Sequence, residues 1–509
     1  MLRSYETKQL SLYSELYHRI PENHILKLIN SAISFKFVNE LLEKSYCKGF
    51  GRPAKEPEMM IRISFLQYLY NLSDERVLQE LQVNLAYMWF IGINPDEDLP
   101  HPSLLAKFRT TRLHECDLDD IMAEIVRQCI KNGLIKEDSG VNIDTTHINA
   151  NTVKKVPERI MKHLAKKIFR SMNKEDYEIP DYEQIENHAE AKEIMKDFLE
   201  NVIENASEEA KLAVDEATEV LESSLFIEQK GIRSLVDKDA RVGNKSKTQQ
   251  FFGYKAEMMQ LAESGLICSL KVENGAYVDG TNFKELFANT RKAGIAINSL
   301  YGDKAYFRKD ILEILKLNKI IPYIPVSASS YKIDETLYSY NKDSDCWNCI
   351  MGNSTIKRKK ETKEKRGKTF EYYLYTFERE KCRNCPKRNE CIGKARTIAK
   401  KLHVSINAPE YYEHSQWAKS KEFYEAYKKR AKIEPKNAEM KRFHGLARAR
   451  GYGLRSVSLQ AKFTAIAVNL KRISQLISSL KPNFLINLFR SIDILEKNGE
   501  ICNFHLLKN

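Results

Sequence analysis

"FFGYKAEMMQLAESGLICSLKVEN" (residues 251–274) contains two runs with the period of β-strands, separated by a short Glu-Ser-Gly turn. Strand-like runs on either side of a glycine-containing turn are typical of a β-hairpin. The stretch therefore predicts two antiparallel strands of a sheet.

The segments after this hairpin alternate between helix and strand. The patterns predict an amphipathic helix for residues 280–294, a strand that ends near Gly302, a helix for 308–319 and a strand for 320–328. Upstream, "VNIDTTHINAN" (141–151) begins with an apolar run that predicts one more strand. The order β, β, β, α, β, α, β predicts an α/β protein with a mixed sheet. It is also the strand order of the ribonuclease-H fold.

Composition narrows the class of partner. The chain has 509 residues, 42% of them hydrophobic, and a formal net charge of +13. This excess favours a polyanion such as nucleic acid, or an anionic membrane surface, although a basic surface without such a partner is the alternative. The N-terminus lacks the apolar core of a signal peptide, and no apolar run could span a membrane. We therefore expect a cytoplasmic protein with no membrane partner.

Two aspartates occupy similar positions in the predicted sheet. Asp144 closes the first strand and Asp303 the fourth, and these strands are neighbours in a sheet of this order. Paired carboxylates repel each other unless a cation lies between them, and Mg²⁺ binds carboxylates together with phosphate oxygens. Two such ions stabilise the attacking and leaving oxygens of a phosphodiester. A turn at Asp144, which has Thr and Asn neighbours, is the alternative.

A third carboxylate is predicted further along the chain. Tyr427, Arg430, Glu434 and Lys441 share one face if they belong to a continuous helix. Pro435 disfavours helix at Glu434, so that either the helix is kinked there or a new helix starts there. From spacing alone, an ordinary solvated face is the better explanation of the stripe.

The spacing Tyr-x2-Arg-x3-Glu-x6-Lys resembles the signature of a large group of bacterial insertion-sequence DDE transposases. Similar segments elsewhere extend the resemblance over roughly residues 35–480: "GRPAKEP", "HPSLLAKFR", "DTTHINANT", "DKDARVG", "YGDKAYF" and "AVNLKRI". The resemblance implies a ribonuclease-H-like catalytic core, with a mixed five-stranded sheet and helices. It also implies an all-helical N-terminal domain and a small cysteine-rich insertion.

The resemblance also implies roles for the signature residues. It implies three catalytic ligands for two Mg²⁺ or Mn²⁺ ions: Asp144, Asp303 and Glu434. It implies three contacts to transposon-end DNA: Tyr427, Arg430 and Lys441. The expected reaction cleaves the element's end and joins the free 3′-OH to target DNA. The expected partners are double-stranded terminal inverted repeats and target DNA, bound by a homodimer associated with a bacterial nucleoid.

The N-terminal segment predicts a second DNA contact. Residues 1–135 have mostly helical patterns, and the short helix predicted for 103–113 follows a turn. Helix, turn and basic helix suit a helix-turn-helix DNA reader, although many helical bundles share this pattern. The predicted DNA contacts of this helix are Lys107, Arg109 and Arg112.

Five of the ten cysteines cluster between Cys346 and Cys391. In a chain without an export signal, clustered cysteines suggest metal rather than disulfides, and the spacing is consistent with a zinc ribbon. Spacing alone pairs Cys346 with Cys349. The resemblance instead implies a different set of zinc ligands, with Cys346 as the alternative: Cys349, Cys382, Cys385 and Cys391. A reduced cluster that packs without metal is the other alternative.

Two further features of the sequence have both a functional and a purely structural explanation. The basic run of residues 357–368 predicts a phosphate-binding loop or a solvated loop. Among the remaining carboxylates, Glu439 is a candidate for a supporting role, and Asp237 and Asp239 more simply form an ion pair with Arg241.

The sequence divides into five predicted regions. They are a helical DNA-binding domain (1–135), the first part of the catalytic core (136–326) with a helical insert at about 155–235, a cysteine-rich β insertion (327–420), the part of the core that carries Glu434 (421–480) and a tail (481–509). Two other functions are compatible with this plan. One is a domesticated relative that binds DNA without catalysis, and the other is a metal-dependent nuclease without strand transfer.

Overall fold

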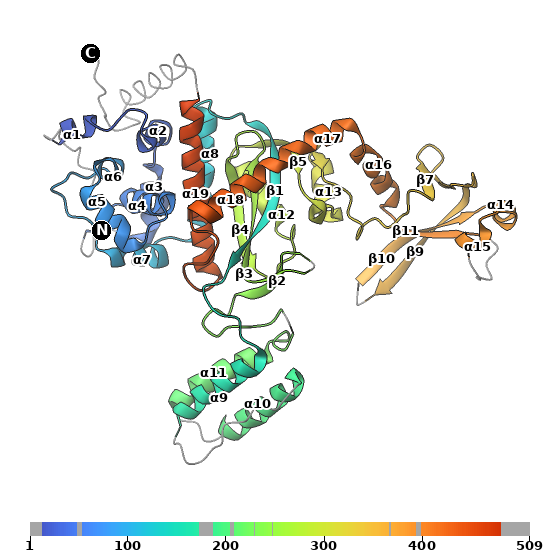
Figure 1. Ribbon diagram of the computed structural model, residues 1–509, viewed down its shortest axis with the longest axis horizontal. Helices are drawn as coiled ribbons and strands as arrows, with labels where there is room; N and C mark the ends of the chain where they lie inside the picture. The colour runs from blue at the N-terminus through green and yellow to red at the C-terminus, as the bar shows by residue number, and fades with distance from the viewer. Residues whose placement is uncertain are drawn as a thin grey trace. The chain divides into compact units, whose positions relative to one another are not determined.

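We describe the protein from a computed structural model (Figure 1). The structure describes residues 13–47, 53–172, 187–203, 208–228, 230–246, 248–365, 368–392 and 399–479. The predicted tail of residues 481–509 lies outside them, as do two positions of the basic run. The chain forms two compact units, one made of residues 1–298 and 431–509 and the other of residues 299–430. None of the described helices is long and apolar enough to cross a membrane.

The first unit begins with helices. They are α1 (Ser14–His18), α2 (Ile25–Ala32), α3 (Phe37–Leu42), η1 (Glu43–Ser45), α4 (Pro57–Leu69), α5 (Asp74–Val83), α6 (Leu85–Ile91), α7 (Pro102–Thr111) and α8 (Glu115–Lys131). Helix α4 is buried on nearly every side, as expected for a helix that is apolar all round. The hydroxyl of Ser73 accepts from the Arg76 amide (3.1 Å) and caps α5. The predicted helical N-terminal region is confirmed.

The large sheet has six strands rather than five. They are β1 (Asp138–Asn149), β2 (Arg241–Asn244), β3 (Gln250–Leu261), β4 (Ile267–Asn274), β5 (Ala296–Tyr301) and β6 (Ile321–Tyr323). Their order is β2-β3-β1-β5-β6, and β4 also pairs with β3. The additional strand is β2, which is too short to show a period in the sequence. It pairs with the start of β3, where Gly243 lies opposite Phe251.

The strand pairings confirm the predicted hairpin and correct the first strand. β3 and β4 are antiparallel, β1 is antiparallel to β3, and β5 is parallel to β6. Asp144 lies opposite Met258 in the middle of β1 rather than at its end, because the strand continues to Asn149 opposite Gly253. The long partner strand provides ladder bonds that hold the Thr and Asn residues after Asp144 in an extended conformation.

Helix α19 (Leu454–Ser478) is the longest described helix of the first unit and is largely buried. The amide of Asn469 bonds both backbone groups of Ile267 in β4, at 2.8 and 2.7 Å. Lys462, which is 2% exposed, pairs with Asp119 of α8 at 2.7 Å. Helices α8 and α12 (Phe283–Lys292) also pack against β4. The sheet and the N-terminal helices therefore share one core.

Two aspartates hold the start of α19. Asp237 Oδ1 accepts from the Gly453 amide (3.2 Å), and Asp239 Oδ2 accepts from the Leu454 amide (2.7 Å). The hydroxyl of Tyr254 also donates to Asp237. Arg241, the predicted ion-pair partner, donates chiefly to backbone carbonyls. The structural role of the aspartates is confirmed, but it depends on helix capping more than on an ion pair.

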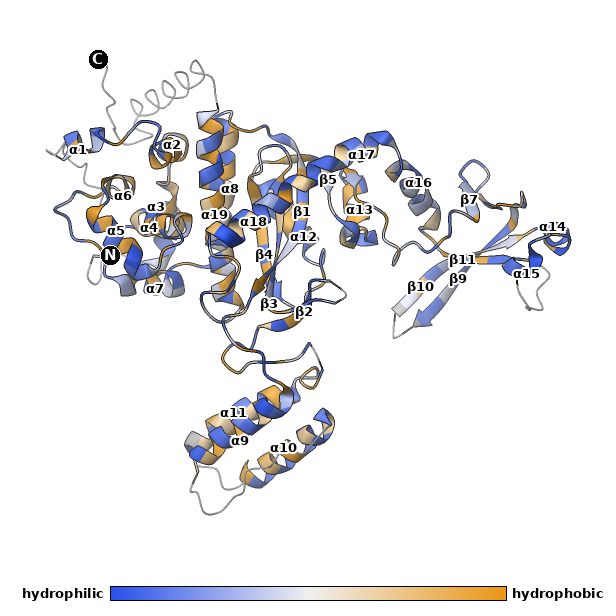
Figure 2. Cartoon of the chain, viewed as in Figure 1, coloured by the Kyte–Doolittle hydropathy of each residue, from blue (hydrophilic) through white to orange (hydrophobic). Residues whose placement is uncertain are grey.

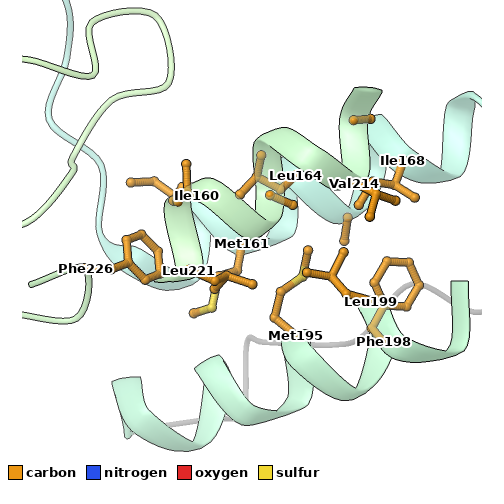
Figure 3. Packing of buried hydrophobic residues seen from close by; sticks show 14 of the residues in the cluster. Ile160, Met161, Leu164, Ile168, Met195, Phe198, Leu199, Val214, Leu221 and Phe226 are labelled. Atoms are coloured by element: carbon orange, nitrogen blue, oxygen red, sulfur yellow. The ribbon is translucent and has the colours of Figure 1, made fainter. Parts of the chain in front are cut away.

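The helical insert has a core of its own. It consists of three helices, one more than a hairpin: α9 (Pro157–Arg170), α10 (His188–Ile203) and α11 (Glu208–Glu222). Each helix has an apolar stripe, and these stripes meet in one cluster (Figure 3). In that view Met161 and Leu164 of α9 lie against Met195 and Leu199 of α10. The charges predicted to form a solvated face cover the outside of this cluster.

The second unit contains two small sheets and short helices. After η2 (Lys304–Tyr306) and α13 (Lys309–Leu317) come β7 (Tyr338–Asn341), β8 (Cys346–Cys349), β9 (Thr355–Lys365), β10 (Lys368–Phe377), α14 (Arg379–Arg383), α15 (Arg388–Cys391), β11 (Lys401–Ser405), α16 (Ala408–Ala418) and α17 (Lys421–Tyr427). The sheets have the orders β11-β10-β9 and β7-β8. Residues 357–365 of the basic run lie in strand β9, so the prediction of a loop was wrong for that part of the run.

Candidate catalytic and DNA-binding site

The first aspartate contacts a helix from the distant end of the chain. Asn437 Nδ2 of α18 (Ile433–Phe443) donates to Asp144 Oδ2 at 3.0 Å. Glu434, Asn437 and Lys441 are spaced by three and four residues, so they share one face of this helix. Helix α18 packs against β1. The predicted ligands Asp144 and Glu434 therefore lie on two elements that meet in the first unit.

A second contact fixes the other end of this face. Lys441 Nζ lies 3.2 Å from His147 Nδ1. A lysine ammonium only donates, so the imidazole is neutral and accepts at Nδ1. Burial lowers the pKa of His147 to about 4, and the charges of Lys441 and Lys245 add to this shift. The ring also contacts Phe251, with 5.1 Å between the ring centroids.

Lys441 itself is held in an unfavourable environment for a cation. Burial lowers its pKa to about 8, the charge of Lys245 contributes in the same direction, and that of Asp144 opposes it. A partly desolvated ammonium beside a second lysine is stabilised by an incoming anion. The arrangement is suited to a DNA phosphate.

Asn437 is a site residue that the sequence reasoning missed. Its Oδ1 is buried and accepts no hydrogen bond from any described residue. The amide thus orients the Asp144 carboxylate with its nitrogen and leaves a hard oxygen beside it. Its position, one turn after Glu434 on the same helical face, was the available signal.

Asp303 lies in the second unit. It follows β5 and Gly302, as predicted, and its Oδ1 accepts from the Ala305 amide at 2.8 Å to cap η2. Across the described parts of the chain, no three or more His, Cys, Asp or Glu side chains form a group arranged for a metal ion. The metal-ligand role of Asp303 stays a prediction.

The signature residues do not share one helix. Tyr427 ends α17, Arg430 lies in η3 (Lys428–Lys432), and α18 begins at Ile433. Of the two alternatives at Pro435, a new helix start is the correct one, because proline is tolerated in a first turn whose amides have no intrahelical partner. The single face therefore holds for Glu434 and Lys441 alone.

The three residues of the α7 region that were predicted to contact DNA differ in whether their side chains are held by other parts of the protein. Lys107 is exposed. Arg109 pairs with Asp74 of α5. Arg112 donates to the Ser45 carbonyl, and its guanidinium lies 4.8 Å from the centroid of the Tyr46 ring. Both guanidinium groups thus hold α7 against its neighbours, and DNA contact by these three residues stays a prediction.

Tyr338 and Asn353 contact cysteines of the predicted zinc set, although no three of those cysteines form a group arranged for a metal ion among the described residues. Tyr338 lies opposite Cys349 in the β7–β8 pair, and its hydroxyl is 3.8 Å from Cys391 Sγ. The backbone carbonyl of Asn353 accepts from the Cys349 amide (2.8 Å), and its side-chain Nδ2 lies 3.1 Å from Cys382 Sγ. Thiolates are the ligands that Zn²⁺ prefers in structural sites, so the chemistry of this set fits that ion.

Cys346 is separated from this group by strand geometry. It is three residues before Cys349 in β8, and an odd spacing places the two side chains on opposite faces. Its sulfur lies 3.0 Å from Ser344 Oγ. The geometry favours Cys349 over Cys346 as a ligand, although zinc binding itself stays a prediction.

Two parts of the chain match known families. Residues 14–111 match a transposase domain (DUF772), and residues 343–474 match a transposase DDE domain. The chain therefore carries the domains of a DDE transposase. The family predicted from the signature is confirmed. The DDE match includes Glu434, whereas Asp144 and Asp303 precede it.

Other comparisons add little to this transposase assignment. No curated protein matches the chain. A cryo-EM structure of the piggyBac transposase synaptic complex with hairpin DNA is 11% identical, covering 94% of this chain and 82% of that chain. The TM-score is 0.32, which is too low to establish a shared fold by itself.

Proposed function

We propose that this transposase cuts the ends of an insertion sequence and joins the 3′-OH to target DNA by two-metal phosphoryl transfer on a ribonuclease-H-like core. The observation that carries the proposal is the 3.0 Å bond between Asn437 and Asp144. It places the helix that bears Glu434 against the strand that bears Asp144. Within a transposase, two carboxylates on such elements are candidates to receive catalytic metal ions.

The donor set fits a hard divalent cation. Asp144 and Glu434 provide carboxylate oxygens, and Asn437 Oδ1 is an additional buried oxygen without a donor. Mg²⁺ and Mn²⁺ prefer such oxygens together with water and substrate phosphate. We assign the third carboxylate to Asp303. When bound, the ions supply positive charge at the attacking and leaving oxygens.

The protein's own residues position the DNA and the ligands. Asn437 restrains the rotamer of Asp144, and His147 holds the ammonium of Lys441. Lys441 and Arg430 neutralise phosphates near the cut, and Tyr427 stacks on a base or donates to a phosphate. Positioning and neutralisation of this kind supply most of the catalysis in phosphoryl transfer.

The partners follow from the same proposal. The transposase binds double-stranded terminal inverted repeats and target DNA, and two protomers hold two ends. In the second unit, a zinc ion on Cys349, Cys382, Cys385 and Cys391 ties the two small sheets and the short helices together. A metal at that position has a structural role and takes no part in the chemistry.

The test is a reaction of the full-length chain with labelled transposon-end DNA and Mg²⁺ or Mn²⁺. Asp144→Asn, Asp303→Asn and Glu434→Gln should abolish nicking and joining but retain DNA binding in EDTA. The control is Glu285→Gln, a surface carboxylate on α12 that pairs with Lys271 and should leave activity unchanged. Nicking without joined products would support a nuclease. Binding without cleavage under any metal would support a non-catalytic relative.

A further inference from the structure

The sheet β11-β10-β9 in the second unit has two unlike faces. Partner residues in antiparallel strands point to the same side. On one side Tyr375 and Phe377 are each 1% exposed, and the Tyr375 ring lies 6.5 Å from that of Trp347. This side, which we call the packed face, is buried in the core of the unit at the end that holds Tyr375 and Phe377. The opposite side, which we call the open face, carries Lys357, Lys359, Lys363, Phe370, Tyr372 and Lys401.

The two faces also differ in how their charges are compensated. On the packed face, Arg358 pairs with Asp345, and Lys360 pairs with Glu371 at 2.5 Å. On the open face, Glu361 is the one acidic side chain among the described residues, and it lies 3.4 Å from the Lys359 ammonium. The hydrophilic character of β9 is visible beside the paler β10 in Figure 2. The open face therefore has an excess of positive charge.

Two aromatic side chains lie between the lysines. Phe370 and Tyr372 are alternate residues of the central strand, so their spacing along it is about 6.8 Å. Phe370 lies opposite Lys363 and is 42% exposed. One row across the three strands runs from Lys357 through Thr376 to Lys401, so lysines flank the central strand on both sides.

An unpaired nucleic-acid strand matches this combination. Lysines on both sides of a strand can each neutralise a phosphate. Exposed rings on a sheet accept stacked bases, as in other single-strand-binding proteins. The bases of a duplex are stacked inside the helix, so a duplex would contact the lysines but not the aromatic rings. The exposed ring of Phe370 therefore favours an unpaired strand over a duplex.

We propose that the open face binds a single-stranded segment of DNA, with its phosphates on the lysines and its bases on Phe370 and Tyr372. The identity of the strand rests on the proposed function, because cutting at transposon ends exposes unpaired DNA. The binding itself does not depend on catalysis.

The test measures binding of the full-length chain to a labelled oligothymidylate of about 20 nucleotides and to a duplex of similar length. No Mg²⁺ or Mn²⁺ is added to any sample, which prevents metal-dependent cleavage and leaves the proposed zinc in place. In Phe370→Ala/Tyr372→Ala, we expect the affinity for the single strand to fall at least about tenfold, with the duplex affected about twofold or less. Thr369→Ala, on the packed face of the same strand, is the control and should behave as wild type.

The contribution of charge is tested separately. Lys357→Gln/Lys359→Gln should reduce the salt slope for the single strand by about 1.4, which makes the loss of affinity between 50 and 200 mM salt about sevenfold smaller. Arg358→Gln/Lys360→Gln removes the same charge from the packed face of the same strand and should have a smaller effect. Thermal melts show that each variant is folded.

Several results would overturn the proposal. One is an equal reduction of the salt slope in the two charge variants. Another is an equal loss of affinity for the single strand and for the duplex in the aromatic variant. The third is an affinity for the single strand that the aromatic substitutions leave unchanged. Because binding is measured without Mg²⁺ or Mn²⁺, absence of cleavage when Mg²⁺ is added would refute the proposed function and leave this result standing.

Discussion

The pKa of Lys441 gives a prediction for the affinity of the transposase for DNA. Its ammonium lies 3.2 Å from His147 Nδ1, and burial together with Lys245 lowers its pKa to about 8. Asp144 is the acidic group that opposes this shift. If the charged ammonium binds a DNA phosphate, affinity should follow its charged fraction.

The magnitude follows from a single titration. With a pKa of about 8, the charged fraction of Lys441 is about 0.9 at pH 7 and about 0.1 at pH 9. The affinity should therefore fall about tenfold over this range, with a limiting slope of one proton. An ordinary lysine, with a pKa of about 10.4, would give almost no change. Lys441→Arg should flatten the profile, because a guanidinium stays charged throughout.

The stability of the free protein should rise with pH, whereas its affinity for DNA falls. A base whose pKa is lowered by folding disfavours the native state while it is charged. The free protein therefore gains stability as pH rises from about 8 toward the unfolded value of about 10.4. Lys441→Met should accordingly raise the Tm of the free protein at pH 7 while it weakens DNA binding.

The assay is fluorescence anisotropy of transposon-end DNA in EDTA between pH 7 and 9. Lys166→Arg, at an exposed position of α9, controls for the change of lysine to arginine and should retain the wild-type profile. A flat wild-type profile would refute the reasoning, and so would an alkaline fall that persists in Lys441→Arg.

Three further variants test other contacts. Asn437→Ala should lower the cleavage rate by about 10- to 100-fold, the value of a hydrogen bond to a charged group, without a change in DNA binding in EDTA; an unchanged rate would remove Asn437 from the site. Asp237→Ala should lower the free energy of unfolding by about 2–4 kcal/mol in urea titrations, because three donors lose their acceptor, and a loss below about 0.5 kcal/mol would contradict the capping role. Cys349→Ser should lose zinc, measured by elemental analysis, whereas Cys346→Ser should retain it; the reverse result would exchange the two assignments.

Local patterns predicted most of the fold because they depend on neighbours in sequence. The hairpin of β3 and β4 and the alternation from α12 to β6 needed nothing but period and turn residues. The end of β1 did not follow from such signals. Asp144 and the polar residues after it favour turns locally, and the pairing that keeps them extended comes from β3, more than 100 residues away.

The family signature predicted some residues of the candidate site, but it did not predict Asn437, whose place in the site depends on a contact between distant parts of the chain. Glu434 and Lys441 were predicted from the resemblance to the transposase signature, but the bond between Asn437 and Asp144 joins residues 293 positions apart. Arg109 illustrates the converse. A basic helix suggested DNA contact, yet its guanidinium is held by Asp74, and no local pattern reveals that partner.

Local patterns also failed to predict the strand within the basic run. Its charges suggested a loop, because lysine-rich segments are usually solvated. It forms β9 because the aromatic strand β10 pairs with it along nearly its whole length. Aromatic residues favour strands, and an edge strand tolerates lysines on its exposed side. The strand preference was therefore present in the partner rather than in the run itself.

The break before α18 explains how one motif can position residues with different tasks. Because the helix begins at Ile433, Glu434 lies in its first turn. Lys441, two turns later on the same face, is fixed relative to Glu434 by the helix. Tyr427 and Arg430 precede the break, so their orientation is set by α17 and η3 instead. The motif therefore spans two helical segments, and only the geometry between Glu434 and Lys441 is set by a single helix.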